Sequence, residues 1–402
     1  MKHARANPGP RRVKRRKWPR VVGAILGLLI LGTGIIMIDS WSALGTRPEG
    51  ARLERLQRSP QFAGGRFANR LPPQEPEMWP VLKRWLFEDN PLREPSEPVP
   101  VVRRVAQDFT SASAEPRITW FGHSSLLVEM DGQRILIDPM WGDYASPGRL
   151  FGVKRFFAPP IPLDDLPPID AVILSHDHYD HLDEPTIKAL RERVPLFAVP
   201  LGLGAHLEYW GVPPERIVEL DWWERVTVGG VELVCTPARH FSGRMVIDRD
   251  ATLWAGWALL GQTRRVFFSG DSGLFPGFAE IGARLGPFDV TMMESGAYNA
   301  DWPDVHMGPE QAVEAHRMVR GRLMLPIHWG TFNLAFHGWT EPVERLLVAA
   351  ERAGVQVAIP RPGESILPAS PPAVERWWPS QPWQTAEEAP VVSTGLVPVV
   401  AE

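Results

Sequence analysis

The sequence has a single cysteine, and outside its first 20 residues it has no excess of positive charge. Cys235 is the single cysteine among 402 residues, so an intrachain disulfide is excluded. It lies in an apolar, strand-like segment, where we expect a small buried residue. Residues 1–20 contain nine Lys or Arg and no acid, and since the whole chain carries −4, the remainder carries −13. An acidic body disfavours nucleic acid as a partner, because phosphate backbones need neutralising cations.

A charge-free apolar run follows this basic arm at residues 21–38. As a helix it would be about 27 Å long, just enough to cross a hydrocarbon core. Trp18 and Trp41 flank it, as aromatic residues do at membrane interfaces. We therefore predict a single-pass transmembrane anchor, with the rest of the chain on the non-cytoplasmic (periplasmic or extracellular) side. A cleaved signal peptide is the alternative, although its apolar region would be shorter and no convincing small-residue cleavage site follows Ile38.

Three segments follow the predicted anchor. Residues 39–116 form a Pro- and Arg-rich connecting region, residues 117–366 a strand-rich body, and residues 367–402 a Pro-rich tail. Within the connecting region, residues 78–87 place apolar side chains at near-helical spacing, which predicts a helix that packs on the body or dips into a membrane surface. We expect the tail, with its clustered Pro and Trp residues, to be poorly ordered or to lie over the surface.

Short apolar runs alternate with helical patterns through residues 117–366, which predicts an α/β fold. The strand candidates are residues 118–120, 126–129, 135–137, 171–174, 196–199, 231–234, 252–260, 266–268, 290–293, 324–327 and 355–359. The helix candidates include residues 184–194 and 311–320. Periodicity alone indicates this class of fold and no more.

The densest cluster of metal-ligand side chains is the run Ser175–His181, which reads Ser-His-Asp-His-Tyr-Asp-His. The apolar residues just before it are typical of a buried strand. His176 and His178 alternate along extended backbone and can reach one ion together, whereas Asp180 and His181 follow after a turn and can serve a second. A solvated polar loop is the alternative, but chance rarely places three imidazoles and two carboxylates so close together.

Three later segments repeat one arrangement, in which an apolar strand ends in a ligand-type side chain beside Gly or Pro. These segments end at His240, Asp271 and His328. A single histidine of this kind would more often be structural. Three such residues in succession, after a clustered motif, predict the ligands that complete a binuclear site.

Together these segments resemble the metallo-β-lactamase superfamily, whose motif is His-x-His-x-Asp-His followed by isolated His, Asp and His ligands. Over roughly residues 117–366 the chain is similar to one branch, the N-acyl-phosphatidylethanolamine-hydrolysing phospholipase D family. The blocks that carry this likeness include Gly122-His123-Ser124, Ile137-Asp138-Pro139, Asp221-Trp222-Trp223-Glu224, Gly296-Ala297-Tyr298 and His328-Trp329-Gly330-Thr331-Phe332. The N-terminal segment and the tail lie outside it.

The resemblance implies an αββα sandwich, in which two mixed sheets pack together with helices on both outer faces. It also implies a centre of two zinc ions, although other divalent metals suit the same residues. The ligands that it assigns are His176, His178 and His240 for one ion, Asp180, His181 and His328 for the second, and Asp271 for both.

The implied activity is that of a membrane-anchored zinc phosphodiesterase of the phospholipase D type. It would release phosphatidic acid and N-acylethanolamine from N-acyl-phosphatidylethanolamine, with hydroxide shared between the ions as the nucleophile. Its partners would be a phospholipid substrate and a membrane, and its oligomeric state is open, a dimer included. Two alternative functions remain open. The first is a metal-dependent lactonase or phosphoesterase that acts on a soluble metabolite, and the second is a non-hydrolytic metal protein or oxidoreductase of the same fold. Di-iron members tend to have Glu where His178 stands, which disfavours redox chemistry.

Asp138 and His306 are the candidates for a role beside the ligands, and Asp180 and Asp271 are expected to serve catalysis as well as metal binding. Metal-bound histidines usually donate their other ring N–H to a carboxylate or carbonyl, and Asp138 ends a predicted strand. His306 resembles a family position associated with activity, with helix capping as the alternative. The sequence around His123 is as compatible with a loop-packing role as with a catalytic one. The histidines expected to be structural, or without a signal, are His206, His316, His3 and His337.

Overall fold

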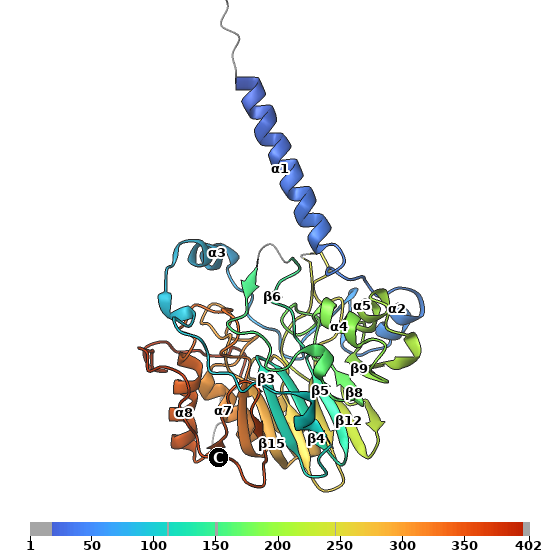
Figure 1. Cartoon of the computed structure of the whole chain (residues 1–402), viewed down its shortest axis with the longest axis vertical. Coiled ribbons are helices and arrows are strands. Elements are labelled where there is room, and N and C mark those ends of the chain that lie inside the picture. Colours follow the sequence, from blue (N-terminus) through green and yellow to red (C-terminus); the bar gives the residue numbers. More distant parts are fainter. Residues whose placement is uncertain (1–17, 111, 149–151, 246, 397–402) are drawn as a thin grey trace, which may run out of the picture.

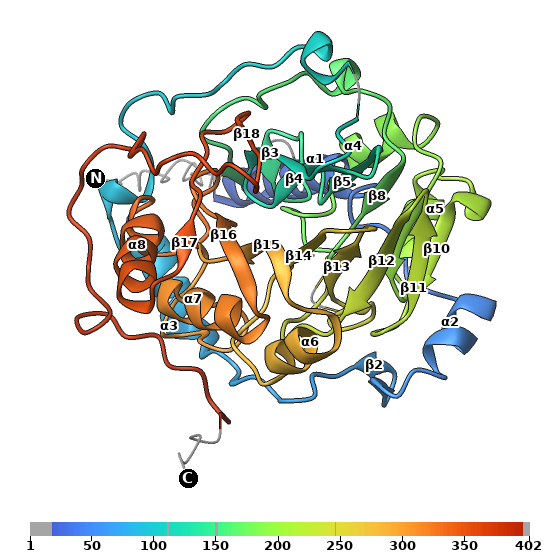
Figure 2. The ribbon, with the colours of Figure 1, turned by 90° about the horizontal axis from the view of Figure 1, so that it is seen from below.

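A computed structural model describes residues 18–110, 112–148, 152–245 and 247–396. Most of the predicted basic arm, His3 included, therefore lies outside the described residues. The body contains two seven-stranded sheets packed face to face, and Figure 2 shows their edges side by side. This arrangement confirms the predicted metallo-β-lactamase-like sandwich.

The first sheet has the order β10-β9-β8-β5-β4-β3-β18, and the second has the order β11-β12-β13-β14-β15-β16-β17. Each sheet combines parallel and antiparallel pairs. The strands of the first sheet are β3 (Arg117–Gly122), β4 (Ser125–Met130), β5 (Gln133–Ile137), β8 (Ala171–Ile173), β9 (Phe197–Pro200), β10 (Ile217–Leu220) and β18 (Ser365–Ile366). Those of the second are β11 (Arg225–Val228), β12 (Val231–Thr236), β13 (Gly256–Leu260), β14 (Arg265–Phe268), β15 (Phe288–Glu294), β16 (Gly321–Ile327) and β17 (Gln356–Val357).

Helices cover the outer face of each sheet. The second sheet is covered by α6 (Gly277–Leu285), α7 (Pro309–Met318) and α8 (Glu341–Ala353), as Figure 2 shows. The first packs against α4 (Glu184–Leu190) and α5 (Gly204–Tyr209). Smaller elements are α2 (Gly50–Leu56), β1 (Phe62–Ala63), β2 (Arg66–Phe67), β6 (Tyr144–Ala145) and β7 (Val153–Lys154).

The continuous apolar strands of the first sheet follow from burial on both faces. In β4, Leu126 and Val128 belong to the core between the sheets, whereas Leu127 belongs to the core beneath α4 and α5. Successive side chains of a strand point to opposite faces, so a strand covered on both sides favours apolar residues on both faces. All six residues of β4 are buried.

Two predicted elements are four residues shorter than expected. The strand predicted at 252–260 begins only at Gly256, because the preceding backbone bonds to the first sheet's loops: Leu253 N–H donates to Leu201 O and Ala255 N–H to Ser175 O. The helix predicted at 184–194 ends at Leu190, where turn-forming hydrogen bonds take over.

The predicted apolar helix is present as α1 (Trp18–Ser40), which leaves the body on the side where α3 (Met78–Phe87) lies (Figure 1). Within the described ranges, however, no helix combines the length and apolarity needed to cross a membrane. The prediction of a transmembrane anchor is therefore not supported, because that combination is the physical requirement for a span.

The tail packs closely on the body in its described part, residues 367–396. Trp378 is buried, and the ring of Trp377 stacks on that of Trp329 at 5.3 Å between centroids. Further along, Thr394 N–H donates to Asp304 Oδ1 at 2.7 Å. Of the two predicted alternatives for the tail, its described part takes the second and lies over the body, because Trp377 and Trp378 pack their rings against Trp329.

Candidate metal centre

Loops at the carboxyl ends of strands bring the predicted ligands together from both sheets. The run Ser175–His181 follows β8 of the first sheet. In the second sheet, β12 leads to His240, β14 to Asp271 and β16 to His328. Each strand is buried and fixes where its loop begins, so residues more than 150 positions apart in sequence meet at one place.

His176, His178 and His240 form what we call the three-histidine group. His178 Nδ1 lies 2.8 Å from His176 Nε2 and 3.2 Å from His240 Nε2. Three ring nitrogens that converge in this way can share one ion, and a histidine triad is a known zinc-ligand set. The structure thus brings together the three residues predicted for the first ion.

Asp180, His181 and His328 form what we call the mixed group. Asp180 Oδ2 lies 3.4 Å from His181 Nε2 and 3.3 Å from His328 Nε2. His123 adds a third imidazole, with its Nε2 at 2.9 Å from Asp180 Oδ2. The three residues predicted for the second ion therefore also converge, and His123 contacts them rather than only packing a loop.

Asp271 lies between the two groups. Its Oδ2 is 3.1 Å from His181 Nε2 and 3.0 Å from His328 Nε2 of the mixed group. The same oxygen is 3.8 Å from His176 Nε2 and from His240 Nε2 of the three-histidine group. One carboxylate is thus within reach of both groups, as a bridging ligand must be.

The residues fit divalent cations in their chemistry as well as in their spacing. Among the described residues, no hydrogen-bond partner is found for the buried His181 Nε2, His328 Nε2 or Asp271 Oδ1. Buried polar atoms are normally satisfied, and here these atoms lie among other ligand-type atoms. Imidazole and carboxylate suit zinc and similar ions. The structure supports metal binding, while zinc as the metal and two as the number stay predictions.

The two groups differ in charge although both are buried. Burial lowers the pKa of all three imidazoles in the three-histidine group, and neighbouring imidazoles lower that of His176 further. In the mixed group, burial opposes the charge of His328, but Asp271 and Asp180 raise its pKa to about 10. The pKa of His181 is raised by the same carboxylates, against burial. Two nearby anions therefore reverse the effect of desolvation.

Asp138 orients the mixed group. Its Oδ2 lies 2.7 Å from His181 Nδ1, and its Oδ1 accepts the Ser175 N–H at 2.7 Å. A carboxylate on the second ring nitrogen fixes a ligand's tautomer, which is the role predicted for Asp138. In the three-histidine group, the backbone carbonyl of Val305 contacts His240 Nδ1 at 2.8 Å and serves the same purpose.

His306 lies beside both groups and contacts a residue that sequence reasoning missed. Its Nδ1 is 3.1 Å from Glu294 Oε2 and 3.9 Å from Asp271 Oδ2. Glu294 is fully buried and ends β15. The signal that pointed to Asp271 was therefore present for Glu294 as well: an apolar strand that ends in a carboxylate beside Ser295 and a glycine.

Asp304 was also missed, and it ties several distant segments to the centre. It accepts hydrogen bonds from Arg239 Nη1 at 2.8 Å and from Gln74 N–H at 2.8 Å, and Thr394 donates to it from the tail. These bonds fix the backbone just before Val305. No local pattern marks Asp304, because its partners lie far away in sequence.

Three of the residues around the centre hold backbone conformations that favour glycine. The φ angles are 52° for His123, 38° for Asp138 and 65° for His328. Left-handed conformations of this kind persist in other residues only where surrounding contacts impose them, and they cluster at functional sites. The other predicted histidines lie apart: His206 is near Asp177, and His316 contacts Thr291.

A cavity of about 380 Å³ opens onto the centre. Its polar end is formed by His178, Asp180, Asp271, His306 and His328. Apolar side chains, among them Met78, Val81, Phe241, Trp302 and Leu334, line most of the rest, together with Gln74, Glu75 and Arg249. The centre is therefore open to a substrate that carries both a polar and an apolar part.

Comparisons with known proteins agree with this fold and site. The Beta-lactamase superfamily domain matches residues 133–329. An N-acyl-phosphatidylethanolamine-hydrolyzing phospholipase D of Caenorhabditis elegans is 38% identical over 261 residues, which cover 62% of this chain and 73% of that protein. An uncharacterized protein of Mycobacterium tuberculosis is 44% identical over 368 residues, covering 87% of this chain and 98% of that protein.

Among solved structures, a possible metal-dependent hydrolase of Veillonella parvula superposes with a TM-score of 0.51. It is 18% identical and covers 63% of this chain and 100% of its own, so this likeness concerns the fold alone. The ligands at the strand ends, the sandwich fold and the sequence relatives all indicate the same family. The chain belongs to the metallo-β-lactamase superfamily of metal-dependent hydrolases, close to the N-acyl-phosphatidylethanolamine-hydrolysing phospholipases D.

Proposed function

We propose that this protein is a zinc-dependent phosphodiesterase that cleaves N-acyl-phosphatidylethanolamine to phosphatidic acid and N-acylethanolamine. The observation that carries the proposal is the joining of two ligand groups by Asp271 at the end of a largely apolar cavity. The relatives named as phospholipases D support this choice of bond.

The charge of the centre indicates how a phosphodiester would be held. Asp271 is buried and Asp180 partly buried, and His181 and other imidazoles hold the pKa values of both carboxyls well below the usual range, against desolvation. Without cations these anions would repel a phosphodiester. Bound divalent ions would supply positive charge for the phosphoryl oxygens and would activate water near neutral pH.

The chain's own residues would position the reactants. Asp138 and Val305 O fix the second nitrogens of His181 and His240, so the ligand rings keep their orientation. His306 lies on the cavity wall and contacts Glu294, so it is placed to give a proton to the departing alkoxide. The apolar wall would receive the acyl chains of the lipid, which excludes water from the reacting bond.

The test is hydrolysis of N-acyl-phosphatidylethanolamine by the zinc-loaded full chain, with products identified by mass spectrometry. We expect phosphatidic acid and N-acylethanolamine, and we expect His178→Ala to lower turnover by at least about a hundredfold, since it removes a predicted ligand. Removal of zinc with a chelator should have the same effect, and zinc should restore the activity.

The matched control is His337→Gln, because His337 is a partly buried histidine outside both ligand groups. It should keep turnover within a few-fold of the unchanged chain. Equal turnover by His178→Ala and the unchanged chain would refute the proposal. Diacylglycerol as the lipid product would indicate the wrong scissile bond, and turnover of soluble lactones or phosphoesters alone would favour a metabolite hydrolase.

A further inference from the structure

Glu294 is a fully buried carboxylate that belongs to neither the three-histidine group nor the mixed group. Its Oε1 accepts the N–H groups of Ser272 and Met307, both at 3.0 Å, and its Oε2 lies 3.1 Å from His306 Nδ1. Within the described ranges, His306 is the only residue that forms an ion pair with it. A buried charge persists only where donors or an opposite charge compensate it. The three groups around Glu294 therefore compensate its charge, and His306 is one of them.

The topology of the second sheet explains the position of Glu294. It ends β15, which pairs with β14 on one side and with β16 on the other. Those two strands lead to Asp271 and His328, so Glu294 comes from the strand between two that deliver predicted ligands. Its bond to the N–H of Ser272, the residue after Asp271, also joins the loop of that ligand to His306.

The hydrogen bonds of Glu294 determine which nitrogen of His306 is free. An ionised carboxylate has no hydrogen to donate, so Nδ1 of the ring must donate to Oε2. The other nitrogen, Nε2, is then the one available to a substrate in the cavity, which His306 lines. A carboxylate that binds one nitrogen of a histidine in this way fixes both the tautomer and the orientation of the ring.

We propose that Glu294 is a positioning residue, which holds His306 so that Nε2–H can give its proton to the departing alkoxide. The bond from phosphorus to that alkoxide breaks while the bond to the attacking hydroxide forms, and the proton moves from Nε2 to the alkoxide oxygen. His306 keeps its Nδ1–H on Glu294 throughout, and it regains a proton from the acidic hydroxyl of the new phosphate monoester. This inference rests on the proposed function and adds the group that orients the proton donor.

Glu294→Gln tests this role because it changes the hydrogen bonds but hardly the size of the side chain. The two backbone N–H groups require the amide oxygen, so the amide NH2 faces His306 Nδ1. The ring must then accept at Nδ1, and its single proton lies on Nε2. A neutral imidazole is a much weaker acid than the imidazolium that a carboxylate stabilises, so proton donation should fail.

The kinetic test compares two phosphodiesters that share the phosphatidyl part. One has an N-acylethanolamine as its leaving group, and the other has nitrophenolate, which departs without a proton because it is a weak base. We expect Glu294→Gln to lower turnover of the first at least about a hundredfold and turnover of the second no more than about threefold. His306→Asn should show the same selectivity, and the double variant should lose little more than either single variant. Equal losses on both substrates would overturn the proposal, as would loss of bound zinc in Glu294→Gln.

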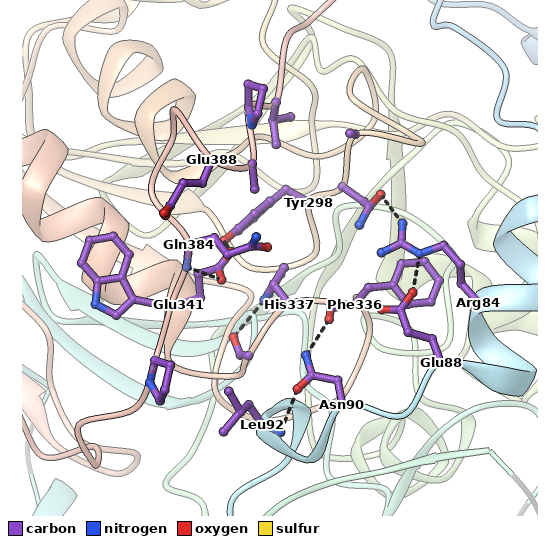
Figure 3. Close-up of a pocket in the computed structure, with 18 residues that line it drawn as sticks. Arg84, Glu88, Asn90, Leu92, Tyr298, Phe336, His337, Glu341, Gln384 and Glu388 are labelled. Carbon is purple, nitrogen blue, oxygen red and sulfur yellow. Dashed lines mark hydrogen bonds and ion pairs between the residues drawn. The ribbon is translucent and has the colours of Figure 1, made fainter.

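The matched control is Glu341→Gln, the same change at a buried carboxylate outside the centre. Glu341 accepts the O–H of Tyr298 at 2.8 Å and the backbone N–H of Gln384 at 3.0 Å. Figure 3 shows these three residues in a second cavity, which shares no described lining residue with the cavity of the metal centre. Any loss of turnover in this variant should be equal for the two substrates. A selective loss like that of Glu294→Gln would overturn the proposal.

A second measurement does not depend on substrate. In the zinc-loaded full chain with ¹⁵N-labelled histidine, we expect the NMR signals of a His306 ring that is protonated at Nδ1, assigned by their absence in His306→Asn. Glu294→Gln should shift these signals to those of a ring protonated at Nε2 alone. An Nδ1 without a proton in the unchanged chain would overturn the proposal. A chain with the expected tautomer that cleaves neither phosphodiester would refute the proposed function and leave the positioning of His306 by Glu294 in place.

Discussion

The three-histidine group and the mixed group face the same carboxylate, yet they differ in how they hold protons. His240 and His328 are both almost fully buried. Burial keeps His240 neutral, whereas Asp271 and Asp180 raise the pKa of His328 to about 10. The identity and burial of a histidine therefore do not decide its charge; the number of anions within reach does.

The groups also differ in what supports them. In the mixed group, the side chain of Asp138 orients His181 from within the first sheet's core. In the three-histidine group, the backbone carbonyl of Val305 orients His240, and the adjacent Asp304 is bonded to the connecting region and the tail. One group thus depends on the core of the sandwich, and the other on segments outside it.

The largest effect is expected from Asp271→Asn, which removes the charge that both groups share. Turnover should fall by about a thousandfold, because several kcal/mol of transition-state stabilisation depend on correctly held ions. Metal analysis should show that both groups hold less metal. The matched control is Asp164→Asn, the same change at a side chain that is 95% exposed. Retention of full metal content by Asp271→Asn would contradict a bridging role.

An effect of about a hundredfold per pH unit is expected in the metal affinity of the mixed group. The pKa values of His181 and His328 are both raised, that of His328 to about 10, so near neutral pH both rings hold protons that a metal ion must displace. Two released protons make the affinity rise about a hundredfold per pH unit. In the three-histidine group the pKa values are lowered, so the rings are already neutral and the affinity should hardly change near neutral pH.

Two variants separate these affinities. His240→Ala weakens the three-histidine group and leaves the mixed group, and His328→Ala does the reverse. Zinc affinity is measured by competition with a chelator at several pH values near neutrality. The affinity should rise steeply with pH in His240→Ala and remain nearly flat in His328→Ala. Equal slopes in the two variants would show that the groups do not differ in protonation.

Much of this centre could be predicted from sequence because each ligand ends an apolar strand. The strand before Ser175 and the one before His328 are recognisable locally, and the sandwich fixes where their ends meet. The motif Ser175–His181 adds two ligand pairs with a turn between them. The individual metal ligands can therefore be recognised from local sequence patterns, and the fold brings them together.

The remainder depends on contacts between segments far apart in sequence. Nothing near Asp304 shows that Gln74, Arg239 and Thr394 converge on it. The order of the tail could not be predicted either, since Pro and Trp clusters are compatible with a disordered segment unless a partner such as Trp329 is known. The different protonation states of His240 and His328 likewise could not be predicted without the positions of Asp180 and Asp271.

The smallest effect is expected from Thr394→Val, which removes the tail hydroxyl that donates to Asp304. Loss of one hydrogen bond to a charged acceptor that keeps other donors should cost about 1 kcal/mol, or roughly fivefold in affinity. Because Asp304 adjoins Val305, whose carbonyl orients His240, the loss should fall on the three-histidine group and spare the mixed group. Chelator competition in the His328→Ala and His240→Ala backgrounds distinguishes the two. The control is Thr385→Val, a tail threonine whose hydroxyl accepts the Glu388 N–H away from the centre. Equal loss in both groups would mean that the tail stabilises the body as a whole rather than orienting His240.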